Sequence, residues 1–356
     1  MKSSNTILTA LLGSLFFAPA AYADKHSHTG HHGHMMMHAP APTGVMGSHT
    51  HKQGKWMFSY RFMTMEMDGN RSGSSHISAE EIATTIPNPN PGPPTFRVVP
   101  TKMNTDMHML GAMYAPTDHF TFMVMVNYLK KDMDHITFQG GAGATRLGKF
   151  TTKSEGWGDT RVSGLYKIYD TNGHKVHLNL GVSLPTGSIT KKDHVLTPMG
   201  TRPELRMPYA MQLGSGTYDL LPGITYQTHH GKWGFGGQYM ATIRLGENSE
   251  DYTLGDEHKL TGWASYDWGN NISTSIRLAY LNADNIDGAD PRIVAPVQTA
   301  DPDNYGKERL DLHAEINWRS SGHRLALEVG TPIYQHLDGP QLEMDWMLTA
   351  GYQYMF

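Results

Sequence analysis

A tract rich in histidine and methionine lies near the start of the chain. Eight of the 21 His of this 356-residue sequence fall between His26 and His51. Imidazole suits Cu(II), Ni(II) and Zn(II), whereas thioethers favour Cu(I), so the mixture indicates copper more than zinc. The predicted metal ligands are His26, His28, His31, His32, His34, Met35, Met36, Met37, His38, His49 and His51. An inert disordered arm is the alternative, because the spacing defines no fixed coordination geometry.

A second group of methionines follows the tract and recurs at every second position. Of the 23 Met, 15 lie between Met35 and Met133. Side chains two residues apart share one face of a strand, so these Met predict a thioether patch on an inner wall. The members are Met57, Met63, Met65, Met67, Met107, Met109, Met113, Met123 and Met125. Three roles stay open: a relay for Cu(I), an adaptable wall for an apolar solute, or packing against a segment that folds inward.

Composition excludes several other chemistries. The chain has no Cys, which removes disulfides, zinc-thiolate sites, iron–sulfur clusters and thiol catalysis. A net charge of -4 without a basic block gives no footprint for nucleic acid. Pairs such as His313 with Glu315 resemble neither a nucleophile elbow nor a zinc-protease box. We therefore predict a protein that is not an enzyme and requires no cofactor, with copper ions as the candidate ligand.

The first residues predict export. Lys2 precedes an apolar run over residues 7–20, and Ala21-Tyr22-Ala23 matches a cleavage site, so residues 1–23 are predicted to be a signal peptide. Later segments do not reach the ~20 consecutive apolar residues of a membrane-spanning helix.

The elements that position the methionines are predicted to be strands. From Trp56, the aromatic residues Trp56, Phe58, Tyr60 and Phe62 alternate with Met57, Ser59, Arg61 and Met63. Similar stretches of about ten residues follow, with aromatic residues at their ends and turn residues between them. Short turns alternate with long polar links, which is typical of an outer-membrane barrel whose short turns face the periplasm.

Counting these stretches predicts an all-β fold, a transmembrane antiparallel β-barrel of about 12 strands. Residues 24–54 are predicted to be a disordered His/Met-rich periplasmic arm, and residues 55–356 the barrel. The expected strands cover 55–67, 103–115, 120–131, 158–169, 175–185, 215–228, 232–245, 258–268, 271–283, 307–319, 323–333 and 342–356. Charged residues of both signs on the inner faces, including Arg277 and Glu328, predict cross-strand ion pairs that plug and stiffen a narrow barrel. A selectivity ring for small solutes is the alternative.

Two stretches carry a family resemblance. Gly216-Thr217-Tyr218-Asp219-Leu220-Leu221-Pro222-Gly223 and His177-Leu178-Asn179-Leu180-Gly181-Val182 resemble the outer-membrane family named for the meta-pathway of phenol degradation. The opening Gly44-Val45-Met46-Gly47-Ser48-His49 and the Met-rich strand after it resemble a His/Met-rich branch of that family, although its usual acidic residue near Ser48 is missing. The resemblance implies an outer-membrane barrel and passage of small organic compounds.

The sequence thus predicts a porin-like channel or transporter in the outer membrane of a Gram-negative bacterium, linked to copper handling. A passive uptake channel for small hydrophobic or aromatic compounds is the alternative. The expected partners are outer-membrane lipid, a small solute or copper ion, and the outer-membrane assembly machinery, which the terminal Tyr352-Gln353-Tyr354-Met355-Phe356 would address.

Overall fold

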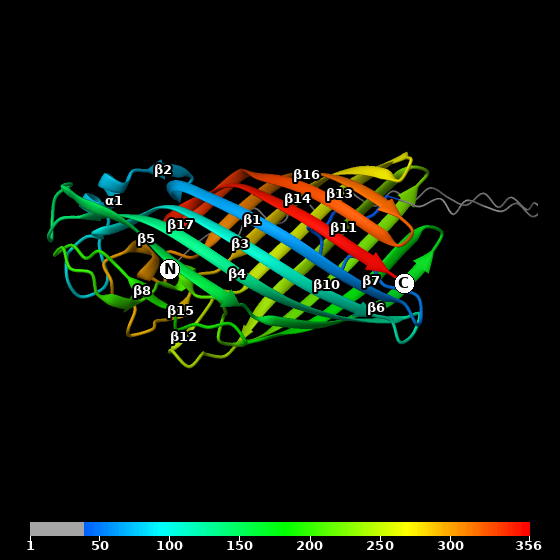
Figure 1. Ribbon diagram of the computed structural model, residues 1–356, viewed down its shortest axis with the longest axis horizontal. Coiled ribbons are helices and arrows are strands. Elements are labelled where there is room, and N and C mark those ends of the chain that lie inside the picture. Colours follow the sequence, from blue (N-terminus) through cyan, green and yellow to red (C-terminus); the bar gives the residue numbers. More distant parts are fainter. Residues whose placement is uncertain (1–38) are drawn as a thin grey trace, which may run out of the picture. The chain divides into compact units, whose positions relative to one another are not determined.

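The computed structural model describes residues 39–356, which form one antiparallel β-barrel (Figure 1). The predicted signal peptide and the ligands from His26 to His38 lie outside the described residues. The helices within residues 39–356 are all too short or too polar to traverse a bilayer.

Eleven strands form the wall of the barrel, and each pairs with the wall strand before it and the wall strand after it in the chain. They are β1 (Trp56–Gly73), β3 (Val98–Tyr114), β4 (Phe120–Phe138), β6 (Thr160–Thr171), β7 (His174–Leu184), β10 (Tyr218–His230), β11 (Trp233–Leu245), β13 (Glu257–Gly269), β14 (Ile272–Ala283), β16 (Lys307–Ser320) and β17 (His323–Met355). Because β17 pairs with β1, no wall edge is left open, as the absence of water inside a bilayer requires.

The last element differs from the prediction. The strands expected at 323–333 and 342–356 are two arms of β17, which spans 33 residues, and the polar link expected at 334–341 is itself strand. Residues 323–337 pair with β16 and residues 337–355 pair with β1. The arms face each other, since Thr331 Oγ1 donates to the Asp345 carbonyl at 3.0 Å. The eleven strands therefore give an even number of spans, which a ring of purely antiparallel pairs requires.

Two further strands lie outside the ring. β2 (Ser75–Ile77) pairs with β1, and β5 (Arg146–Trp157) pairs with the upper part of β4. β5 falls within a link that the sequence analysis expected to have no strand. The outward face of this hairpin is polar, with Lys130, Asp132 and Lys153, so it lacks the apolar outward face by which the other strands were found.

The remaining elements gather at the end of the barrel opposite the C-terminus (Figure 1). They are α1 (Ala79–Thr85), β8 (Lys192–His194), β9 (Glu204–Arg206), η1 (Tyr209–Met211), β12 (Tyr252–Thr253), β15 (Asp287–Gly288) and η2 (Gln298–Ala300). At the other end the strands are joined by tight turns. Asn172 and Gly173 both have positive φ, 53° and 79°, which matches the twist of a two-residue hairpin. We call the end with long loops the outer end and the end with tight turns the inner end, following the prediction that short turns face the periplasm.

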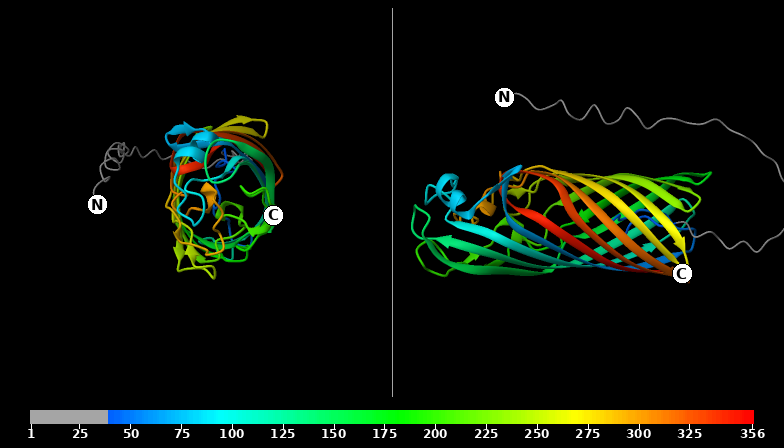
Figure 2. Two further views of the ribbon diagram at one scale, coloured as in Figure 1. Left: turned by 90° about the vertical axis from the view of Figure 1, so that its left-hand side faces the viewer. Right: turned by 90° about the horizontal axis from the view of Figure 1, so that it is seen from above.

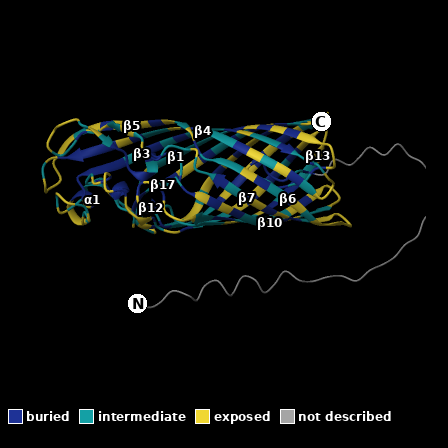
Figure 3. Ribbon diagram, turned by 90° about the horizontal axis from the view of Figure 1, so that it is seen from below, coloured by how far each residue is buried: buried dark blue, intermediate teal, exposed yellow. Residues whose placement is uncertain are grey.

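Burial alternates along the wall strands near the tight turns (Figure 3). Leu180, Ile276 and Leu110 expose 64%, 60% and 51% of their surface, although each is apolar. Their neighbours Asn179, Ser275 and Met109 are buried. The outer surface of the wall is therefore apolar and its inner surface largely polar, which is the arrangement of a barrel in lipid.

Candidate functional site

The structure places all nine predicted thioether residues on the inner face of the wall. Trp56, Phe58 and Tyr60 point outward and are exposed, so the alternate residues of β1 face the lumen. On β3, Leu110 is exposed while Met109 and Met113 are buried. The methionines of β3 therefore lie on the same inner face as those of β1 and β4.

The strand register aligns these methionines in rows. Near the tight turns, Met57 lies opposite Met113, which lies opposite Met123. Met57, Met113 and Leu165 are buried there as one cluster, against which Met123 packs. Farther up, Met63 lies opposite Met107.

The sequence analysis missed the row nearest the loops. Met103 lies between Met67 and Met133 in register, and Met67 also lies opposite Met344. Met103 and Met133 share the two-residue period of their strands and could have been found by extending those strands. Met207 and Met211 pack on the same row from a loop that has no periodicity, so no local signal could find them.

The described part of the predicted arm, residues 39–54, runs along the inside of the wall rather than free of the barrel. It is the blue segment inside the barrel near the C-terminus (Figure 1). Wall side chains donate to its carbonyls: Ser265 to Pro40 at 3.0 Å, Arg324 to Ala41 at 2.8 Å, Gln238 to Met46 at 2.9 Å and His177 to Gly47 at 2.8 Å. Apart from a turn in which the Val45 amide donates to the Pro42 carbonyl at 3.0 Å, these wall donors satisfy carbonyls that would otherwise be buried without partners.

Apolar contacts and ionic contacts hold the same segment. Ala41 and Val45 pack with Trp263, which points inward from β13. The Thr43 amide donates to the Glu315 carboxylate. A Cβ on Gly44 would overlap the side-chain ends of Arg277 and Glu328, so a larger residue there would have to displace this ion pair. The segment therefore fills the inner end of the lumen.

Glu315 belongs to a buried network of charges on the lumen side. The Arg324 guanidinium contacts Glu315 at 3.2 Å, and Arg277 contacts Glu328 at 2.6 Å. These pairs confirm the ion pairs expected across the inner faces. Each charge is balanced by a partner, which a charge removed from water requires.

His49 and His51, the two predicted metal ligands that the structure describes, meet within this inner segment. Their ring centroids are 4.8 Å apart. The His51 amide donates to Thr121 Oγ1 at 3.0 Å. Within residues 39–356, no three His, Asp or Glu side chains are grouped so that they could hold a metal ion.

The outer end of the barrel is closed differently, by loops that share an apolar core. Nine buried residues from these loops and from the tops of β3 and β5 form it: Val98, Phe150, Leu196, Tyr209, Tyr252, Ile286, Ile293, Val297 and Ala300. Figure 2 shows these loops gathered over the mouth of the barrel. Burial raises the pKa of the Tyr252 hydroxyl, so it stays neutral in the core.

Arg97 ties the first two outer loops together. Its side chain is fully buried and donates to the carbonyls of Ala83, Gln139, Gly140 and Ala142, at 2.8 to 3.2 Å. It also lies over the Phe138 ring, 5.6 Å from the centroid. A guanidinium that satisfies four carbonyls fixes the geometry of the loops around it.

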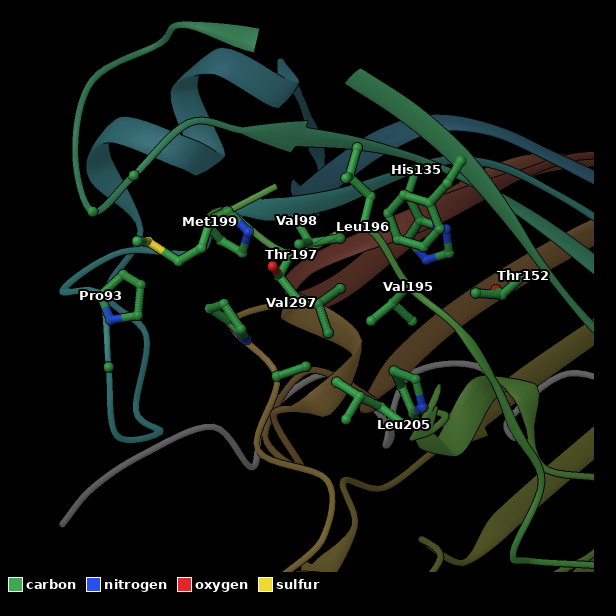
Figure 4. Close-up of a pocket in the computed structure, with 18 of the residues that line it drawn as sticks. Pro93, Val98, His135, Thr152, Val195, Leu196, Thr197, Met199, Leu205 and Val297 are labelled. Atoms are coloured by element: carbon green, nitrogen blue, oxygen red, sulfur yellow. The ribbon is translucent and has the colours of Figure 1, made fainter. Parts of the chain in front are cut away.

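A pocket of about 560 Å³ opens among these loops (Figure 4). Its walls include Val98, Val195, Leu196, Val297 and the ring of Phe150, against which His135 stacks at 4.6 Å. Few polar side chains line it, among them Thr152, Thr197 and Arg206. A largely apolar cavity of this size with few polar groups suits a small apolar ligand.

Comparisons with known proteins bear on the fold. A crystal structure of an outer-membrane channel from Pseudomonas putida F1 matches 88% of this chain and 99% of its own, with 16% identity and a TM-score of 0.57. The chain has the fold of an outer-membrane barrel. A structure of the TodX monoaromatic hydrocarbon channel matches with 8% identity, 86% of this chain, 91% of its own and a TM-score of 0.42. No family model and no curated protein sequence matches the chain.

Proposed function

We propose that the protein is a channel of the Gram-negative outer membrane that admits small apolar solutes, including aromatic ones. The observation that carries this proposal is the apolar pocket at the outer end, where a solute from outside would first bind. The fold and the resemblance to the family of the phenol meta-pathway support it. This function corresponds to the alternative of the sequence analysis rather than to its main prediction.

The path inward begins at the pocket floor. Thr152 lies there and pairs in register with Met133, so the floor adjoins the outermost thioether row. Thioether side chains are flexible and polarisable, and they adapt to apolar solutes of different shapes. Residues 39–51 then fill the inner end, so passage requires that this segment shift.

The pocket is tested by filling it. In Val195→Trp the new indole would occupy the cavity that Val195 lines. We expect binding of naphthalene to the purified protein, followed by its fluorescence, to weaken. Losing about 80 Å² of apolar contact at ~25 cal/mol/Å² costs about 2 kcal/mol, or roughly thirtyfold in affinity.

The control is Val294→Trp, because Val294 is an exposed residue of an outer loop that does not line the pocket. It should leave naphthalene affinity unchanged. Equal affinities for both variants and the unaltered protein would refute the pocket as the solute site.

Copper handling is the second candidate function. The observation that favours it is the alignment of methionines along the inner wall, from Met57 near the tight turns to Met67 near the loops. The His/Met tract of residues 26–38 would add ligands on the periplasmic side. A deletion strain should then grow less well on copper salts, whereas loss of growth on aromatic carbon sources alone would favour the solute channel.

A further inference from the structure

We propose that Met67, Met103, Met133, Met207 and Met211 form a binding site for a soft monovalent metal ion, Cu(I) or Ag(I). This site deepens the copper-handling candidate and rests on it. Four of the five residues were absent from the ligands predicted from the sequence.

The wall supplies three of the thioethers in one row. Met67 on β1 lies opposite Met103 on β3, and Met103 lies opposite Met133 on β4. Directly opposite residues on neighbouring strands bring their side chains within contact on one face. Met103 and Met133 are 4% and 1% exposed, so water is excluded from this row.

The loop around η1 supplies the other two thioethers from above the row. Met207 and Met211 are both fully buried against Met103 and Met133, and the only other residues in this cluster are Ala210 and Leu342. Five of the seven apolar residues of this cluster are therefore methionines, whose sulfur atoms can serve as metal ligands.

Hydrogen bonds hold that loop in place. Lys131 Nζ donates to the carbonyls of Ala210 at 2.8 Å and Gln212 at 2.6 Å. Ser154 Oγ donates to the Met211 carbonyl and Gln212 Nε2 to the Met207 carbonyl, both at 2.7 Å. These hydrogen bonds fix the backbone that carries both methionines, in addition to the packing of their side chains. Fixed ligands lose little freedom when a metal binds.

Ligand chemistry selects the ion. Neutral thioethers favour Cu(I) over Zn(II) and over hard cations, which prefer oxygen ligands. A thioether has no proton to lose, so its affinity for metal is independent of pH, whereas imidazole must be neutral to bind. An ion would enter through the outer pocket, because its lining residues Arg206 and Pro208 flank Met207.

The test is a titration of the full mature chain with Ag(I), followed by calorimetry, and with Cu(I) in competition against a chromophoric chelator. At about pH 5 a histidine with the ordinary pKa of about 6.5 is protonated, whereas burial lowers the pKa of His51 to about 4. The matched methionine variants therefore decide whether metal bound at that pH is held by thioethers. We expect the unaltered chain to keep a bound equivalent at this pH.

The decisive variant is the triple Met103→Leu, Met133→Leu, Met207→Leu, because Met and Leu have similar volumes and shapes. The matched control changes Met57, Met113 and Met123 to Leu in the other buried thioether cluster, near the tight turns. We expect the first triple variant to lose the equivalent of metal that the unaltered chain binds at about pH 5. The control triple variant should retain it.

Each contrary result has a distinct meaning. Loss in the control triple alone would overturn this site and leave copper handling in place. Retention by both triples would overturn it as well, and absence of binding in the unaltered chain would refute copper in the lumen altogether.

If the first triple fails to assemble, X-ray absorption of the unaltered chain loaded with Cu(I) at the same pH decides: sulfur ligands alone support the site, and nitrogen or oxygen ligands refute it. The solute pocket is tested separately by naphthalene binding, so a failure of the metal site can be told apart from a failure of the solute channel.

Discussion

The two ends of this barrel are closed by different physical means. At the inner end a single segment, residues 39–51, is held mainly by side chains of the wall that bond to its carbonyls, with Val45 as an apolar contact. At the outer end several loops share an apolar core of nine buried residues. A polar attachment can exchange its bonds for water, whereas an apolar core resists water. The inner closure should therefore open more readily than the outer one.

The strongest test of this comparison is in a second apolar cluster of the outer loops, in which Phe138 packs with Ile82 and Phe96. Phe138→Ala removes a ring that is fully buried beside Arg97. Core truncations of this kind cost about 3 to 5 kcal/mol. We expect hydrogen exchange in residues 79–97 to speed up greatly while exchange in residues 39–51 stays the same. Equal acceleration at both ends would show that the two closures are coupled.

The next largest effect is expected from the hydrogen bond between the inner segment and the Glu315 carboxylate. Glu315→Gln weakens the bond from the Thr43 amide and leaves Arg324 without its carboxylate. Hydrogen bonds to charged groups contribute about 1.5 to 3 kcal/mol. The variant should raise single-channel conductance in planar bilayers, because the segment is held less tightly. Unchanged conductance would mean that this contact does not limit opening.

A smaller effect is expected from the apolar contact of the same segment. Val45→Ala removes two methyl groups that pack near Trp263. At ~0.8 kcal/mol for each buried group, the loss is about 1.6 kcal/mol. Proteolysis within residues 39–51 should become faster than in the unaltered protein, but slower than in Glu315→Gln. The reverse order would show that apolar contact, not polar attachment, dominates the inner closure.

The smallest effect serves as a reference for the outer end. Arg146 and Glu80 form an ion pair on the outer loops, with about half of each side chain exposed. Exposed pairs contribute about 0.2 to 1 kcal/mol and weaken with salt. Arg146→Gln should change exchange in residues 79–97 only slightly, and the change should vanish at high salt. An effect as large as that of Phe138→Ala would contradict an outer closure held by its apolar core.

Much of the wall could be predicted from the sequence. Alternation assigned Trp56 and Phe58 to the lipid face and Met57 to the lumen, and the observed burial agrees. The alternation failed at β5, where the outward face is polar, and at residues 334–341, where polar residues continue a strand. In both places the strand extends beyond the apolar band, so its outward side chains do not face lipid and need not be apolar.

The candidate site was predictable only in part. The two-residue period found the inner methionines of β1, β3 and β4, whereas nothing local indicated Met207, Met211 or the pocket at Val195. Those residues come from loops whose neighbours are distant in the chain.

The sequence by itself determined which side chains share a face, because the pleat of a strand repeats within a few residues. It also determined that the wall faces lipid, since its outward residues are apolar. Only the tertiary structure decided that residues 39–51 lie inside the lumen and that the outer loops share a core. Those contacts join residues far apart, such as Thr43 and Glu315, and they depend on how the closed barrel brings its strands around a common interior.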